Sequence, residues 1–152
     1  MPGKIISPVK ILLVEDALQD IEIAHRAFAK GSIRSDLIVV RDGQDALDYV
    51  FRRGKFQDPA LSPSPGMILL DLNLPKVGGL EVLQKIKQDE RHKAIPIVVM
   101  TVSQREEDIV NSYRLGVNTF IQKPIEFEKF QNVVNTIQEY WTLVATLPPT
   151  VQ

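Results

Sequence analysis

Short apolar runs alternate with amphipathic stretches along this chain. Most of the runs are apolar at every position rather than at every second one. Continuously apolar strands are typical of a parallel sheet that helices cover on both faces, because neither row of side chains then meets water. We therefore expect strands at Val9–Val14, Leu37–Val40, Met67–Leu70, Ile97–Met100 and Thr119–Ile121.

The segments between these runs have the period of an amphipathic helix, with apolar residues at spacings of three and four. The clearest stripe is the last one, which begins at Phe127. The stripes are Leu18-Ile21-Ala24-Phe28, Ala46-Leu47-Val50-Phe51, Val82-Leu83-Ile86, Ile109-Val110-Tyr113 and Phe127-Phe130-Val134-Ile137-Trp141-Val144. Five strands that alternate with five helices predict a doubly wound α/β domain, since parallel strands need helical crossovers.

Composition and charge narrow the class of protein. With 152 residues, 44% of them apolar and 24% charged, the chain is expected to form a single domain over residues 1–152. The net charge of −1 gives no general attraction to nucleic acid or to a membrane. The absence of cysteine excludes disulfides and thiolate metal sites. The first apolar run is too short, and meets acids too soon, for a signal peptide, so a cytoplasmic location is expected.

Polar residues suited to metal and phosphate chemistry follow four of the predicted strands. Glu15 and Asp16 come after the first strand, Asp71 after the third, Thr101 after the fourth and Lys123 after the fifth. Open α/β sheets bind their ligands at the carboxyl ends of the strands, so we expect these side chains to converge.

This set of side chains predicts phosphoryl chemistry. Three converging carboxylates repel one another, and their oxygen atoms are the ligands that Mg²⁺ prefers, so we expect this ion among them. Asp71 would attack a phosphorus atom, while the metal and Lys123 neutralise charge on the transferring group. Thr101 would donate a hydrogen bond to that group once it has arrived.

The same positions carry a family resemblance over about Val9 to Val144. The motifs are Val14-Glu15-Asp16, Leu70-Asp71-Leu72-Asn73-Leu74-Pro75 with Gly78-Gly79, Met100-Thr101 and Lys123-Pro124. Together they resemble the receiver domain of two-component response regulators, typified by the chemotaxis protein CheY. The resemblance implies a CheY-like, flavodoxin-like (βα)5 fold with a five-stranded parallel sheet.

The resemblance also implies roles for individual residues. Asp71 would be the phosphoacceptor, Asp16 a direct metal ligand and Glu15 its support, and Asn73 would offer its backbone carbonyl to the metal. The switch pair would be Thr101 and Phe120. The peptide bond between Lys123 and Pro124 would be cis.

A narrower resemblance points to the cyanobacterial phytochrome response regulators, which are stand-alone receivers paired with light-sensing histidine kinases. It is carried by the long loop before the third strand, Ser112-Tyr113, Val117-Asn118-Thr119-Phe120-Ile121, Tyr140-Trp141 and Leu147-Pro148-Pro149. It implies a phytochrome-type sensor histidine kinase as the partner. With no DNA-binding domain expected, the output would come from protein contacts.

Two positions depart from the family pattern. Val102 stands after Thr101, where a small side chain is usual, and a β-branched group there would slow phosphoryl entry and loss. Ala17-Leu18 follows Asp16, where this subfamily usually has Asn-Pro. Both departures bear on the rate of phosphorylation more than on its occurrence.

The final helix has more apolar residues than one core-facing stripe requires, because Val133 and Tyr140 broaden it. Receivers commonly use the fourth helix, the fifth strand and the fifth helix as an interface. We therefore predict a homodimer through this face.

Two other functions remain open from the sequence. A receiver-like scaffold would bind partners without being phosphorylated, and Val102 leaves room for that. A small haloacid-dehalogenase-like phosphatase also uses an aspartate after a strand, but it needs a second Asp two residues later as general acid, where this chain has Asn73.

Overall fold

The computed structural model describes residues 9–31, 35–102, 105–117, 119–123 and 126–139. Its strands are β1 Val9–Val14, β2 Ser35–Val40, β3 Met67–Leu70, β4 Ile97–Thr101 and β5 Thr119–Gln122. Its helices are α1 Leu18–Lys30, α2 Gly43–Phe51, α3 Gly79–Gln88, α4 Glu106–Arg114 and α5 Phe127–Glu139, with a short 3₁₀ helix, η1, at Gly54–Phe56. All the strand pairings are parallel, in the order β2-β1-β3-β4-β5.

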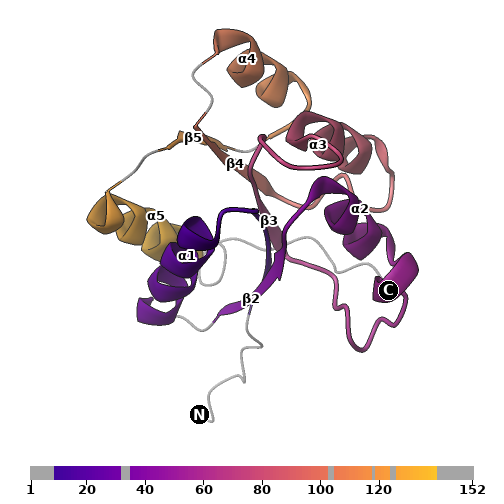
Figure 1. Cartoon of the computed structure of the whole chain (residues 1–152), viewed down its shortest axis with the longest axis horizontal. Coiled ribbons are helices and arrows are strands. Elements are labelled where there is room, and N and C mark those ends of the chain that lie inside the picture. The colour runs from indigo at the N-terminus through magenta and orange to yellow at the C-terminus, as the bar shows by residue number, and fades with distance from the viewer. Residues whose placement is uncertain (1–8, 32–34, 103–104, 118, 124–125, 140–152) are drawn as a thin grey trace, which may run out of the picture.

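Helices cover both faces of this sheet. Figure 1 shows α1 and α5 together on one side, and α2, α3 and α4 on the other. The sheet order reverses between β1 and β3, and ligands of doubly wound folds bind outside the strand ends at such a switch point. The predicted (βα)5 fold is confirmed.

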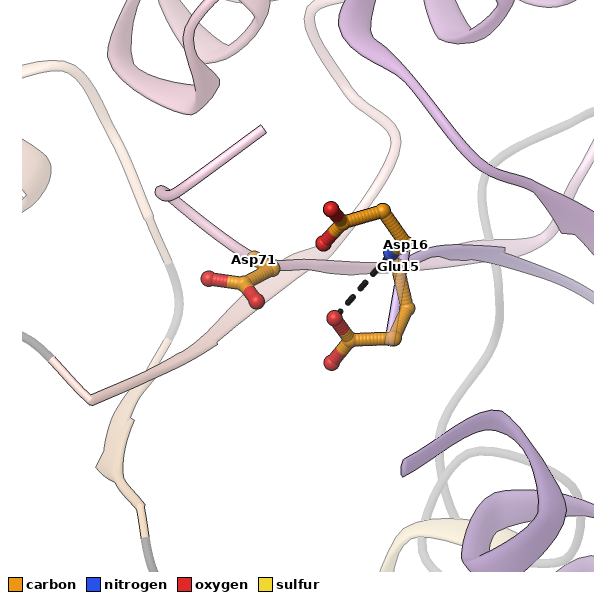
Figure 2. A group of neighbouring side chains, drawn as sticks. All are labelled: Glu15, Asp16 and Asp71. Carbon is orange, nitrogen blue, oxygen red and sulfur yellow. Dashed lines mark hydrogen bonds between the residues drawn. The ribbon is translucent and has the colours of Figure 1, made fainter. Parts of the chain in front are cut away.

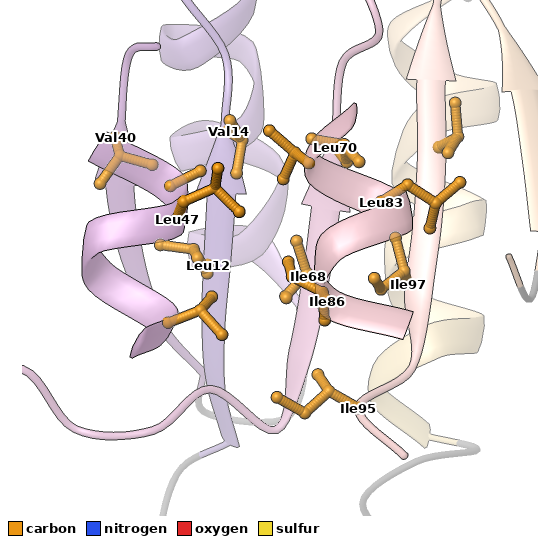
Figure 3. Packing of buried hydrophobic residues seen from close by; sticks show 14 of the residues in the cluster. Leu12, Val14, Val40, Leu47, Ile68, Leu70, Leu83, Ile86, Ile95 and Ile97 are labelled. Carbon is orange, nitrogen blue, oxygen red and sulfur yellow. The ribbon is translucent and has the colours of Figure 1, made fainter. Parts of the chain in front are cut away.

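Side chains along the inner strands point alternately to the two faces of the sheet, and both faces are buried. This explains why the sequences of these strands are continuously apolar. Leu12 and Val14 pack into the core beneath α2 and α3, which Figure 3 shows from close by. Ile11 and Leu13 point the opposite way, into the core beneath α1 and α5. A fully buried side chain of this size contributes roughly 1.5–3 kcal/mol, so each strand stabilises both layers at once.

The strand ends differ slightly from the sequence-based expectation. β1 and β3 have the predicted bounds, whereas β2 begins two residues earlier and β5 ends one residue later. Thr101 is the last residue of β4, paired in register with Gln122, and not the first residue after the strand. Its β-branched side chain suits an extended backbone, which is why the strand continues through it.

The long segment before β3 is irregular, as its three prolines predict, apart from η1. Two side chains hold it against the domain: the Tyr49 hydroxyl donates to the carbonyl of Pro63 at 2.7 Å, and the Arg52 guanidinium donates to Ser64 Oγ at 2.9 Å.

Several sequence-based predictions rest on residues outside the described part of the chain. These residues are Asn118, Pro124, Tyr140, Trp141, Val144 and Leu147-Pro148-Pro149. The cis peptide bond and the far end of the last apolar stripe therefore stay predictions. No helix in the described ranges is long and apolar enough to cross a membrane.

Candidate functional site

Three carboxylates meet at the carboxyl ends of two neighbouring inner strands, β1 and β3. Glu15 and Asp16 follow β1, Asp71 follows β3, and Figure 2 shows their side chains turned toward a common space. One carboxylate oxygen from each lies within 4.8 Å of the others. Glu15 and Asp71 are buried, with exposed fractions of 3% and 8%. The structure thus brings together the three acids that the sequence singles out.

Backbone hydrogen bonds continue the sheet ladder into the site. Glu15 N donates to the carbonyl of Val40, and Asp71 N donates to that of Val14, both at 3.0 Å. The backbone of each of these two acids is therefore fixed by hydrogen bonds to the neighbouring strand, and this fixes the position of its Cα. The Asp71 carboxylate is held further, because Asn73 N donates to its Oδ1 at 2.9 Å.

The start of α1 is organised by Glu15. The N-cap residue of this helix is Ala17, whose side chain cannot accept a hydrogen bond. Glu15 Oε2 accepts from the backbone N–H groups of Asp16 and Ala17, at 3.1 and 3.4 Å. The Arg41 guanidinium donates to the carbonyl of Asp16 at 3.0 Å. These contacts fix the turn that carries two of the acids.

Helix α3 begins directly against the backbone of the Asp71 turn. Gly79 N donates to the carbonyl of Leu72 at 3.0 Å. A Cβ on Gly79 would lie 2.4 Å from the carbonyl oxygen of Asp71 and 2.4 Å from the Cα of Leu72. Only glycine allows this approach, so the residue belongs to the architecture of the site.

Lys123 supplies positive charge to the acids from the end of β5. Its ammonium forms buried ion pairs with Glu15 and, at 3.4 Å, with Asp71 Oδ2. A third partner is Asp20 in the first turn of α1, whose Oδ2 lies 2.9 Å from Lys123 Nζ. Lys123 N also donates to the carbonyl of Thr101 at 2.7 Å, which ties the ends of β4 and β5.

Burial and neighbouring charges shift the pKa values of two groups in this cluster. Burial raises the pKa of Glu15 to about 7, and the hydrogen bond from Lys123 offsets only part of this effect. Burial by itself lowers the pKa of Lys123, but Glu15, Asp20 and Asp71 outweigh it and hold that pKa above its ordinary value. Lys123 is therefore charged at neutral pH, while Glu15 is close to its midpoint.

The two residues of the predicted switch pair lie on β4 and β5, on the side of the sheet next to the Asp71 strand. Thr101 is fully buried, and its Oγ1 accepts a hydrogen bond from the Asn73 amide at 3.2 Å. Phe120 lies in β5 in register with Val99, is half-buried, and packs against the core beneath α2 and α3. Thr101 therefore reaches the acid cluster through Asn73.

A cavity of about 310 Å³ opens beside the acids, between α1, α5 and the sheet. Its charged side is formed by Glu15, Asp20, Asp71 and Lys123, and most of the other lining side chains are apolar. Val102 lines it too and is 57% exposed, which places this departure from the family pattern at the pocket.

Sequence reasoning missed two features of the site. It did not single out Asp20, although a carboxylate in the first turn of the helix after β1 was an available signal. It assigned Asn73 only a backbone role, whereas the side chain of this residue also bonds Thr101.

The donor set fits a hard divalent cation. All the candidate ligand atoms are oxygens, two of the three carboxylates are buried, and they lie close enough to share one ion. The raised pKa of Glu15 has the same origin, because gathering carboxylates away from water disfavours their charged form. A cation would relieve that cost, as Lys123 does in part.

Comparison with known proteins gives one consistent picture. Residues 11–135 match the model of the response regulator receiver domain. The response regulator Rcp1 of Synechocystis sp. is 40% identical over 141 residues, which cover 93% of this chain and 94% of that protein.

Two solved structures are similar over nearly the whole chain. The phosphorylated cyanobacterial phytochrome response regulator RcpA superimposes with a TM-score of 0.84 at 41% identity, covering 94% of this chain and 100% of that one. The Mn²⁺-bound form of Rcp1 superimposes with a TM-score of 0.83 at 39% identity, covering 93% and 100%.

Proposed function

Because this chain belongs to the response regulator receiver domain family, we propose that it is a phosphorylation-dependent switch whose phosphoacceptor is Asp71. The observation that carries the proposal is the position of the Asp71 carboxylate, beside two further acids and 3.4 Å from the Lys123 ammonium. One Asp71 oxygen is held by Asn73 N, which fixes the direction of the group.

The donor in this proposal is a phosphohistidine on a sensor kinase. An Asp71 carboxylate oxygen attacks phosphorus, the O–P bond forms, and the N–P bond breaks with its electron pair leaving on the imidazole nitrogen. Lys123 offsets negative charge on the transferring group, which is the main demand of phosphoryl transfer. The product is an acyl phosphate that water later hydrolyses, so the protein resets without being a classical enzyme.

Mg²⁺ is the proposed cofactor. Glu15, Asp16, Asp71 and the backbone carbonyl of Asn73 would hold it, and it would supply positive charge beside the transferring group. The similar Rcp1 structure is a Mn²⁺-bound form, and Mn²⁺ is a divalent cation of the same oxygen-preferring class.

Thr101 and Phe120 form the proposed switch. Once Asp71 is phosphorylated, the Thr101 hydroxyl donates to a phosphoryl oxygen, and Phe120 turns into the space that Thr101 leaves. The surface over residues 105–116 and 118–121 changes as a result. Phosphorylation acts here as a ligand does, by favouring one of two states through its differential contacts.

The proposed partners are a phytochrome-type histidine kinase and a second copy of the chain. The kinase assignment is supported by the similarity to RcpA, a phytochrome response regulator, and to Rcp1. The homodimer would use the face made by α4, β5 and α5, where β5 is the edge strand of the described sheet.

The decisive experiment follows the mass of the intact protein with acetyl phosphate and Mg²⁺. Wild type is expected to gain one phosphoryl group, and Asp71→Asn none, because the amide is not a nucleophile. Glu81→Gln, on the exposed face of α3, removes one acid elsewhere and is the matched control. Transfer from a red-light-sensing histidine kinase to wild type, but not to Asp71→Asn, tests the partner.

The other outcomes distinguish the alternatives. No modification of wild type by any donor would leave the unphosphorylated scaffold as the better description. Multiple turnover of small phosphate esters would indicate the phosphatase instead. Modification that persists in Asp71→Asn would move the phosphoacceptor to another side chain.

A further inference from the structure

Within the described part of the chain, Lys123 has one ion-pair partner that lies outside the three-carboxylate cluster. Asp20 Oδ2 is 2.9 Å from Lys123 Nζ, closer than Asp71 Oδ2 at 3.4 Å. Asp20 comes from the first turn of α1, whereas the clustered acids follow β1 and β3. Lys123 is thus held between the helix and the sheet, with Asp20 on the helix side.

We propose that Asp20 is a positioning residue that holds Lys123 before phosphorylation and competes with the incoming phosphoryl group for its ammonium. This inference rests on the proposed function, because it assigns Lys123 to the phosphoryl group on Asp71. It makes Asp20 a determinant of how readily Asp71 is phosphorylated.

Exposure distinguishes Asp20 from the other partners of Lys123. The side chain of Asp20 is 39% exposed, whereas those of Glu15 and Asp71 are 5% and 10% exposed. A carboxylate that water can reach loses little when its cation leaves, while a buried one is left uncompensated. Asp20 is therefore the partner that releases Lys123 at the lowest cost.

The cavity gives the ammonium room to move. Asp20, Lys123 and Asp71 all line the same space of about 310 Å³. Lys123 Nζ already lies within ion-pair distance of both Asp20 and Asp71, so only a short shift separates the two partners. Asp20 also lies outside the set of acids proposed to hold the metal, so it stays available to Lys123 when a cation occupies that set.

A purely structural role for Asp20 makes a different prediction. An acid in the first turn of a helix interacts favourably with the helix dipole, and Ala17 offers no side-chain cap. On that reading, Asp20→Asn lowers stability and changes no affinity. Competition for Lys123 instead predicts that removing the charge strengthens binding of a phosphoryl mimic and weakens binding of a cation.

The test measures both affinities in the full-length protein. Beryllium chloride with fluoride, titrated at saturating Mg²⁺ and followed by amide NMR shifts, reports binding of the mimic to Asp71. Asp20→Asn is expected to lower the half-saturating concentration by about two- to fivefold, the range for a partly exposed ion pair. Calorimetric titration of Mg²⁺ without fluoride is expected to show weaker binding in the same variant.

Two control variants define the result. Glu22→Gln removes the same charge from an exposed position of α1, and it is expected to leave both affinities unchanged. Asp20→Glu keeps the charge and is expected to behave like wild type. Equal affinities in Asp20→Asn and wild type, or the same shift in Glu22→Gln, would overturn the inference alone. A wild type that never binds the mimic would refute the proposed function as well.

Discussion

Glu15 is the residue in which burial and the proposed metal binding act against each other. The residue as a whole is 3% exposed, and burial raises the pKa of its carboxyl group to about 7. A cation needs the charged form, so a proton on Glu15 competes with the metal. The Lys123 ammonium favours the charged form, but not enough to restore the ordinary pKa. This single side chain should therefore make both stability and metal affinity depend on pH near neutrality.

Glu15→Gln is expected to gain stability relative to metal-free wild type as the pH rises from about 5 to about 7.5. In that window the folded wild type keeps a proton on Glu15 that the unfolded chain, with its pKa near 4.5, has released. The folded protein binds more protons, so the contribution of Glu15 to stability falls as the pH rises. Glutamine does not titrate. Urea unfolding in a chelator at several pH values measures the difference.

The control for this pH series is Glu81→Gln, an exposed acid on α3 that has no part in the site. Its stability should follow that of wild type at every pH. A Glu15→Gln difference that stays constant across the window would show that the pKa of Glu15 is not raised. Added Mg²⁺ should stabilise wild type more than Glu15→Gln, since the variant lacks one of the proposed ligands.

At the level of elements, helix α3 is attached directly to the turn that carries Asp71. The first residue of the helix, Gly79, lies in contact with the backbone of Asp71 and Leu72. The preceding Gly78 has open space around the position of a Cβ. Two neighbouring glycines therefore differ completely in what a methyl group would meet.

Gly79→Ala is expected to lower the free energy of unfolding by about 1–3 kcal/mol, because the new methyl group forces α3 away from the turn. Gly78→Ala should change it by less than about 0.5 kcal/mol, since its backbone has φ of −70° and nothing lies nearby. Urea unfolding of both variants measures the contrast. Equal losses in the two would mean that the helix start can shift freely.

The strands could be predicted from the sequence nearly to the residue, because burial on both faces leaves a continuous apolar run. Met67–Leu70 is fully buried, and its predicted bounds are confirmed. β2 is only half-buried over most of its length, and its polar first residues hide its start. Thr101 is polar and ends an apolar run, so the sequence places it after β4, although its backbone remains in the ladder.

The candidate site was predictable where it depends on the sheet and not where it depends on helix orientation. Parallel strands end at one edge, so the convergence of Asp71 and Lys123 follows from the strand assignment. The contact between Asp20 and Lys123 depends on the angle at which α1 leaves β1, and no sequence pattern gives that angle. The Asn73–Thr101 hydrogen bond depends likewise on the path of the loop after β3.

At the scale of the whole molecule, the proposed homodimer makes a prediction about the α4 face. Tyr113 on α4 is 51% exposed, and Leu61, in the loop before β3, is 81% exposed. Tyr113→Asp is expected to weaken self-association by about tenfold or more, as loss of an aromatic contact with burial of a charge does at interfaces. Leu61→Asp should leave it unchanged. Sedimentation velocity at micromolar concentration, with and without phosphorylation, measures both.

Sedimentation as a monomer in every state would remove the homodimer from the proposal. Equal weakening by Tyr113→Asp and Leu61→Asp would leave a dimer but place its interface elsewhere.

The ion pair between Glu15 and Lys123 joins residues 108 positions apart in the sequence. Contacts of such long range form late, because the loop they close must first be ordered. A ribosome-bound chain that has not yet emerged through β5 has the acids of the site but lacks the Lys123 ammonium. In the proposed function, newly made protein therefore becomes competent for phosphoryl transfer only when β5 has docked, and a fragment that ends before Lys123 would lack the cation that balances the transferring group.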